Sequence, residues 1–345
     1  MIMRWILFWC LLMLCFCGIW RPTIRYDVIR DGRYDTEFPY RSCASELNTI
    51  FGSVKKLHCI VEYRYYRFAI EKKITREDLT DFFINKRAAY ADHEVQSVFG
   101  TALVISNHNG YIGLMTCAHV VDFPDTVIQY FDYDSVYVKS IAFKIKQRHI
   151  IYDVPEGGDF ELLIKDSFFD IALLGRQFTM EESIQIPVFG YPLGKARELE
   201  LGNFLYVLGY PLGNPMITQG LVSNPGRSKE GHFLIDALFN RGYSGGIVLA
   251  IRDGAPNFEL MGIVKSVSAE TYWELRPSNG HIDAQTVTER LPYTGPLFVE
   301  NQTNIRYGIT FTVPIELIIR FLKTHEPFLE SKGFYLKDWL KKGNS

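Results

Sequence analysis

The chain has 345 residues, with 37 Lys and Arg against 39 Asp and Glu, which gives a formal net charge of −2. Without an excess of positive charge it cannot neutralise many phosphates, so duplex nucleic acid is excluded as its main partner. Disorder is excluded as well, because 47% of the residues are hydrophobic and can bury enough surface to offset the loss of chain entropy.

The first 20 residues form an apolar segment that is typical of membrane targeting. Arg4 is its one charged residue, and the stretch from Trp5 to Trp20 is uncharged and mostly apolar. As a helix this stretch would span about 24 Å, which is short of the roughly 30 Å hydrocarbon core of a bilayer. It favours an uncleaved signal anchor, with a cleaved signal peptide or a cytoplasmic amphiphilic segment as alternatives. We therefore expect a protein that is membrane-anchored or exported, with residues 1–20 as its membrane contact.

The arginines around this segment leave the side of the membrane open. We expect the rest of the chain outside the cytoplasm, because such segments direct export. The charge bias favours the opposite side, since by the positive-inside tendency basic residues stay in the cytoplasm. Arg4 alone precedes the segment, and four arginines come after it: Arg21, Arg25, Arg30 and Arg33.

Residues 21–90 predict a juxtamembrane α/β stalk that packs onto the domain after it. A short helix is expected around Ser45–Lys56, and then an aromatic-rich run from Ile60 to Ile70. Thr75 and its acidic neighbours have the spacing of a capping box, which predicts a second helix. We assign no chemistry to this stretch.

Six cysteines are present, three of them within residues 1–20. The other three, Cys43, Cys59 and Cys117, cannot all pair with one another, and no Cys-x-x-Cys spacing indicates a metal. Single buried thiols are the favoured state, with a bridge between Cys43 and Cys59 as the alternative. We expect neither a metal nor another cofactor.

Residues 91–325 predict an all-β domain, because short β-like runs alternate there with turn signals. Asn109-Gly110 is the pair that a tight hairpin turn requires. Residues 326–345 are expected to form a helical tail. The expected strands are Val95–Ser106, Tyr111–Met115, Ser135–Ile145, Phe160–Ile164, Ile171–Leu174, Phe204–Leu208, Phe233–Ala237, Ile247–Ala250 and Leu260–Val267.

Ser244 lies in the segment with the clearest chemistry, between Gly242 and the pair Gly245-Gly246. Glycines around a serine let the backbone turn tightly and aim amide donors at the space that the hydroxyl faces. A serine hydroxyl needs a base to act as a nucleophile. His119 ends one strand-like run and Asp170 enters another, so the chain order is His, Asp, Ser.

The motifs around these three residues resemble those of trypsin-like serine proteases, and most of all the HtrA or Deg branch. The resemblance extends from about residue 93 to 323, roughly two thirds of the chain. Each motif alone is weak, but six occur in the family's order. They are Gly100–Ile105, Asn109–Ile112, Thr116–Val121, Leu208–Gly213, Thr218–Ser223 and Tyr307–Pro314.

This resemblance implies two six-stranded β-barrels and a serine endopeptidase that acts on polypeptides. It implies that His119 is the general base, that Asp170 orients it and that Ser244 is the nucleophile. The backbone N–H groups of Gly242 and Ser244 would form the oxyanion hole. Asp166 and Asp159 stay open as alternatives for the carboxylate.

The chain also departs from the family's pattern around the serine. Tyr243 stands where Asn or Asp is usual, Ile247 where Pro is usual, and Arg241 replaces a common Pro. A tyrosine there would crowd the oxyanion loop or reshape the leaving-group side of the cleft. The chain ends about 20 residues after the expected closing helix, so we expect no PDZ domain. The oligomeric state is left open.

The primary specificity pocket is expected to be apolar. By the resemblance, Leu238 would line its floor, and Val264, Lys265 and Ser266 its wall. An apolar floor offers no partner to Arg or Lys, which predicts cleavage after small or medium apolar residues.

Three other interpretations compete with this one. The serine motif also satisfies the nucleophile elbow of α/β-hydrolases, with His281 or His325 and Asp283 as partners, but alternating helices are missing. A P-loop at Gly190–Ala196 is rejected, because it is one residue short and lacks the Ser or Thr that holds magnesium. The remaining alternative is a catalytically silent, membrane-tethered trypsin-like module that binds polypeptides.

Overall fold

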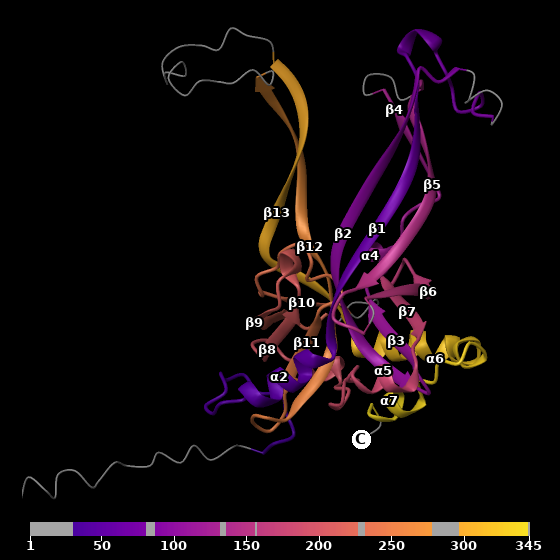
Figure 1. Cartoon of the computed structure of the whole chain (residues 1–345). Coiled ribbons are helices and arrows are strands. Elements are labelled where there is room, and N and C mark those ends of the chain that lie inside the picture. Colours follow the sequence, from indigo (N-terminus) through magenta and orange to yellow (C-terminus); the bar gives the residue numbers. More distant parts are fainter. Residues whose placement is uncertain are drawn as a thin grey trace, which may run out of the picture.

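The computed structural model describes residues 30–80, 87–131, 136–155, 157–226, 232–277 and 297–343. Two β-barrels make up most of this part of the chain (Figure 1). The predicted membrane segment, residues 1–20, lies outside the described residues. Within the described residues, no helix is long and apolar enough to cross a membrane.

The first barrel closes because β1 pairs with β2 on one side and with β5 on the other. The ring runs β1-β2-β3-β7-β6-β5, which makes six strands, and β4 pairs with β5 outside it. The strands are β1 (Val54–Arg67), β2 (Tyr90–His108), β3 (Tyr111–Thr116), β4 (Thr126–Tyr130), β5 (Val138–Ile151), β6 (Gly158–Asp166) and β7 (Ile171–Gln177).

Strand β1 differs from the expectation of a separate stalk over residues 21–90. Its Leu57, Cys59 and Val61 are fully buried and alternate with half-buried residues, as in a strand with one face on a core. An aromatic-rich run with this alternation buries more surface in a barrel wall than in a free stalk. The first barrel therefore begins before residue 91, with Val54.

The second barrel is closed in the order β10-β13-β12-β11-β8-β9. All its pairings are antiparallel, and two six-stranded barrels fit the expected trypsin-like fold. Its strands are β8 (Phe204–Gly209), β9 (Met216–Asn224), β10 (Phe233–Ile235), β11 (Ile247–Ile251), β12 (Phe258–Pro277) and β13 (Leu297–Pro314).

Short helices cover the ends of the barrels. The helix expected near Ser45 is present as α2. Thr75 bonds to Asp78 through its hydroxyl and its amide, and residues 81–86, where the second expected helix would continue, lie outside the described residues. The C-terminal α6 runs through the expected boundary at residue 326. The helices are α2 (Ala44–Gly52), α4 (Ala118–Val121), α5 (Met180–Ile184), α6 (Ile315–Ser331) and α7 (Lys337–Lys341), with 3₁₀ turns η1 (Ile70–Lys72), η2 (Ala196–Glu198) and η3 (Pro211–Gly213).

Two groups of strands extend beyond the barrels as arms (Figure 1). One arm consists of β1, β2 and β5 with β4 beside them, and the other is the β12–β13 hairpin. Both arms point to the same side of the molecule, and α4 lies near their base. One hydrophobic core runs through both barrels and includes residues of α2, α6 and α7.

Candidate active site

His119 projects from a single helical turn, α4, at the end of β3. Its neighbours Ala118, Val120 and Val121 are buried and fix the turn against the first barrel. The His119 side chain is left 46% exposed, so one edge of the imidazole is open to a substrate.

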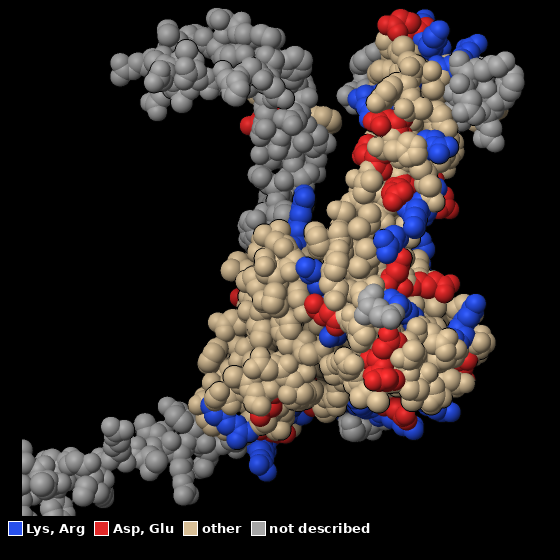
Figure 2. Space-filling view, viewed as in Figure 1, with Lys and Arg blue, Asp and Glu red and all other residues tan. Residues whose placement is uncertain are grey.

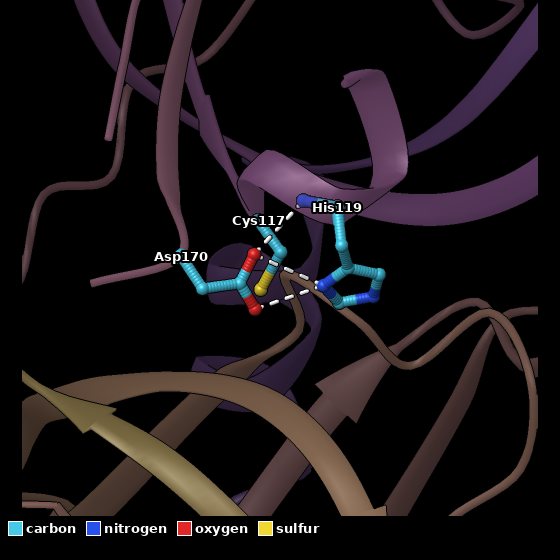
Figure 3. A group of neighbouring side chains, drawn as sticks. All are labelled: Cys117, His119 and Asp170. Carbon is cyan, nitrogen blue, oxygen red and sulfur yellow. Dashed lines mark hydrogen bonds and ion pairs between the residues drawn. The ribbon is translucent and has the colours of Figure 1, made fainter. Parts of the chain in front are cut away.

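Asp170 holds the other edge of this imidazole (Figure 3). Its two carboxylate oxygens lie 2.8 and 3.0 Å from Nδ1 of His119, and Oδ1 also accepts the His119 backbone N–H at 2.8 Å. Asp170 is buried and its φ is +61°, a left-handed conformation that Asp tolerates better than most residues. The turn before β7 therefore aims the carboxylate at His119. This contact fixes the Nδ1–H tautomer, which leaves Nε2 as an acceptor.

Ser244 completes the arrangement from the second barrel. Its Oγ lies 2.9 Å from Nε2 of His119, so the hydroxyl can donate its proton to the imidazole. Gly245, with φ +83°, brings the chain so close to β2 that a Cβ would lie 2.1 Å from the Thr101 carbonyl oxygen. Only glycine permits this approach, which seats the serine between the barrels.

The alternative carboxylates have other partners. Oδ1 of Asp166 accepts the backbone N–H groups of Phe168 and Phe169, which shapes the turn before Asp170. Asp159 pairs with Arg148. The structure therefore brings His119, Asp170 and Ser244 together and leaves Asp166 and Asp159 outside the group.

The backbone N–H groups of Gly242 and Ser244 donate no hydrogen bond within the described part of the chain. The N–H of Leu212 in η3 donates to the Arg241 carbonyl at 2.8 Å. In a trans peptide the N–H points opposite to the C=O, so this bond turns the Gly242 N–H away from η3. Gly242 has φ +106°, and a Cβ would lie 2.4 Å from the Tyr210 carbonyl oxygen.

Thr101 on β2 ties this loop to the first barrel. Its backbone N–H donates to the Ser244 carbonyl at 2.8 Å. Its Oγ1 donates to the Gly242 carbonyl at 2.7 Å and accepts the Tyr210 N–H at 2.9 Å. Thr101 is fully buried, so these bonds are shielded from water. One threonine therefore holds the carbonyls on both sides of Tyr243.

Tyr243 does not crowd the cleft. It is 1% exposed, and its ring lies 6.1 Å from that of Phe239 in the interior. Its hydroxyl has no partner among the described residues, and burial raises its pKa to about 12. Ile247 is likewise fully buried, at the start of β11. Two of the three departures from the family's pattern are thus core residues, whereas the third, Arg241, is exposed.

Cys117 lies behind the His119–Asp170 pair, and ligand atoms of the three residues fall within 4.8 Å of one another (Figure 3). The thiol is fully buried and donates to the Val264 carbonyl at 3.2 Å. Burial raises its pKa well above the ordinary value, with the Asp170 charge as a further cause. A neutral thiol is a poor metal ligand, and Nδ1 of His119 already faces the carboxylate. The group therefore suits proton transfer better than metal binding.

Cys43 and Cys59 are also buried free thiols, as favoured from the sequence.

The residues expected to line the specificity pocket lie at different depths. Leu238 is 63% exposed, whereas Val264 is fully buried. Backbone contacts explain the position of Val264, since its N–H donates to the Gly246 carbonyl and its own carbonyl accepts the Gly245 N–H. The Lys265 carbonyl lies 3.5 Å from Oγ of Ser244, which puts this part of β12 beside the serine. The backbone of Ser266 continues β12 next to it.

Comparison with known proteins supports the class that the barrels and this site define, the trypsin-like peptidases. Residues 100–256 match the family model described as a trypsin-like peptidase domain. The matched region contains His119, Asp170 and Ser244, and the match supports the resemblance of the motifs.

A relative among curated proteins lies on the expected branch. It is a "Serine protease HtrA-like" of Staphylococcus haemolyticus, 27% identical over an alignment of 182 residues that covers 43% of this chain. The matched region spans only 28% of that protein's length. Together the two findings support a serine protease of a trypsin-like family near HtrA.

The sequence did not predict that three further residues belong to this site. They are Thr101, Leu212 and Cys117. All three lie within the family-like motifs, but a motif does not say which carbonyl a buried side chain or a backbone N–H bonds. Leu212 acts through its N–H, held by a left-handed backbone at φ +51°, and a leucine gives no signal of that conformation.

Proposed function

We propose that the protein is a serine endopeptidase that cleaves peptide bonds through an acyl-enzyme. The observation that carries the proposal is the continuous chain of contacts from Asp170 through His119 to Oγ of Ser244, with 2.8 Å and 2.9 Å between successive atoms. Such a chain activates a serine at neutral pH. The trypsin-like match and the HtrA-like relative support the same reaction.

In the first step, Oγ of Ser244 attacks the scissile carbonyl carbon as Nε2 of His119 takes its proton. Asp170 stabilises the imidazolium. The developing oxyanion accepts hydrogen bonds from the N–H groups of Gly242 and Ser244. Collapse breaks the C–N bond, and His119 gives its proton to the leaving amine. Water then attacks the acyl-enzyme by the same route and releases the acid.

The substrate is a polypeptide, cleaved after small or medium apolar residues. Lys265 supports the exclusion of basic residues, because its charge acts on the buried Cys117 thiol and so lies near the His119–Asp170 pair. A cation there disfavours substrates with Arg or Lys at the cleaved position. A panel of peptides that differ in this one residue tests it, and preferential cleavage after Arg or Lys would contradict it.

An active-site serine probe tests the reaction itself. We expect a fluorophosphonate to label the folded protein, and Ser244→Ala and His119→Ala to abolish labelling. Peptidase activity should fall by about 10⁴ to 10⁶-fold in both variants. Ser223→Ala is the matched control, because Ser223 is an exposed serine of β9. Folded protein without labelling would instead identify a silent polypeptide-binding module.

We also propose that residues 1–20 tether the protein to a membrane or direct its export, with the protease domain outside the cytoplasm. The support is the apolar stretch that follows Arg4. Protease added to intact cells should degrade a C-terminal epitope tag. A tag that is protected until the cells are lysed would place the domain in the cytoplasm.

A further inference from the structure

Strand β2 has a long free edge that begins next to the nucleophile. Along its inner edge β2 pairs with β1 over its whole first part, from Tyr90 to Leu103, with no break in register. Along its outer edge it pairs with β3, but only from Leu103 onward. Among the described residues no strand covers the outer edge from Tyr90 to Ala102.

The hydrogen bonds at one end of this edge fix which residues face outward. The backbone N–H of Thr101 points to the outer edge, where it meets the Ser244 carbonyl. The N–H of Val104 points to the opposite side, where it meets the Ser53 carbonyl just before β1. Main-chain groups in a strand alternate between its two edges. Phe99, Ser97 and Val95 therefore direct their N–H and C=O groups outward.

These outward groups are open to a partner. The N–H of His93 is taken by the Asp92 carboxylate at 2.7 Å, so the open edge ends near Val95. No hydrogen bond from the N–H groups of Val95, Ser97 or Phe99 occurs in the described part of the chain. Val95 is 64% exposed and Phe99 38%. The arm stands clear of the barrels as a ridge (Figure 2), and β2 forms its border toward β12 and β13 (Figure 1).

We propose that this edge, from Phe99 to Val95, binds the segment of the polypeptide substrate on the C-terminal side of the cleaved bond, as an added antiparallel strand. The proposal rests on the proposed peptidase function. Its main argument is continuity, because Thr101 joins the edge to Ser244 through a single 2.8 Å hydrogen bond. Unpaired strand edges recognise extended chains in this way.

The direction of the substrate is set by the two strands that flank the serine. β12 lies beside Ser244 at Lys265 and takes the acyl side, which includes the residue before the cleaved bond. The leaving side then continues past Thr101 and along β2 toward Val95, against the direction of that strand. From Phe99 to Val95 the edge measures about 14 Å at roughly 3.4 Å per residue, enough for about five substrate residues.

Peptides with one acyl side and different leaving sides test the proposal. We expect kcat/KM to be about tenfold higher with six leaving-side residues than with two, since each main-chain hydrogen bond contributes a few-fold. N-methylation should lower kcat/KM about fivefold at every second leaving-side position and have little effect between them. Equal values for both lengths, or no alternation, would overturn the proposal.

A variant of the edge gives a second test. Ser97→Pro removes one outward N–H, which an edge strand tolerates, whereas Ser97→Ala keeps it. Within each variant, kcat/KM of the long peptide is divided by that of the short one. We expect this ratio to fall about fivefold in Ser97→Pro and to stay at the wild-type value in Ser97→Ala. An equal fall in both variants would point to the serine side chain and contradict pairing.

Binding to the Ser244→Ala protein separates this inference from the proposed reaction. Fluorescence anisotropy measures the affinity of the long peptide and of its N-methylated forms without cleavage. If the wild type does not cleave the peptides, but N-methylation at every second position lowers their affinity for the Ser244→Ala protein, the edge site is kept and the peptidase function is rejected. If the wild type cleaves the peptides, but neither kcat/KM nor affinity alternates with the N-methylated position, the peptidase function is kept and the edge site is rejected.

Discussion

A carboxylate that contacts both the side chain and the backbone of His119 does more than supply a charge. The double contact from Asp170 sets the angle of the imidazole as well as its tautomer. The left-handed backbone of Asp170 makes both bonds available from one turn. Substitutions at this position should therefore separate geometry from charge.

We expect Asp170→Asn to lower kcat by about 10⁴-fold while the fold is kept. Asn tolerates the left-handed conformation, but its amide presents a donor to Nδ1 and favours the wrong tautomer. Steady-state kinetics with thermal unfolding measures both effects. Asp166→Asn is the control and should retain activity within a few-fold, because Asp166 only shapes the turn. Equal losses in the two variants would contradict the assigned role of Asp170.

His149 gives the first barrel a dependence on pH. It is buried between the Phe160 carbonyl and the Gln147 amide, and burial lowers its pKa below the ordinary 6.5. The folded state thus favours the neutral ring, while the unfolded chain binds a proton below about pH 6.5. Its contribution to stability is present above that pH and is lost as the pH falls.

We therefore expect the free energy of unfolding to fall between pH 7 and pH 5, and to fall less in His149→Asn. Asn keeps a donor for the Phe160 carbonyl and does not titrate. Urea unfolding of both proteins at the two pH values gives the comparison. The same fall in both proteins would show that His149 is not responsible.

At the scale of elements, the sequence predicts most strands of both barrels, because alternation and Asn-Gly turns are local signals. The runs at Tyr111, Phe204 and Ile247 begin strands at those residues. The role of β1 could not be predicted in this way. Whether a strand belongs to a barrel or to a separate stalk depends on the strands with which it pairs, and these are distant in the chain. The helix expected after Thr75 stays a prediction, because residues 81–86 lie outside the described part of the chain.

The membership of β1 in the barrel leads to a stability prediction. Leu57→Ala should lower the free energy of unfolding by about 2–5 kcal/mol, because it leaves a cavity in the core. Ile60→Ala on the same strand should cost less than about 1.5 kcal/mol, since Ile60 is only half-buried. Urea unfolding measures both variants. A small, equal cost would mean that β1 can detach without loss of the barrel.

At the scale of the whole molecule, the site exists only where the two barrels meet. His119 and Asp170 belong to the first barrel and Ser244 to the second, so the order of the motifs could predict the triad but not the contact that aligns it. That contact is Thr101, whose bonds reach two carbonyls of the second barrel. The high exposure of Leu238 could not be predicted for a related reason, since exposure depends on how the loops fold where the two barrels meet.

Thr101→Val should lower kcat by about 10 to 100-fold with little change in KM. Valine keeps the shape but leaves the Gly242 carbonyl and the Tyr210 N–H without their partner, so the loop that carries the Gly242 and Ser244 N–H groups loses its position. Thr101→Ser keeps the hydroxyl and should restore kcat to within about threefold. Rates are normalised to the fraction that a fluorophosphonate labels, which removes unfolded protein. Failure of serine to restore the rate would indicate a packing role instead.

The reactivity of the Cys117 thiol can report on the opening of the contact between the two barrels. A shielded, neutral sulfur reacts with alkylating reagents only during the moments when the surrounding structure opens. The rate of modification of Cys117 therefore measures how often the two barrels separate. An inhibitor that binds tightly to both barrels should lower this rate of alkylation. The ratio of the rates without and with the inhibitor measures how much its binding stabilises the contact between the barrels.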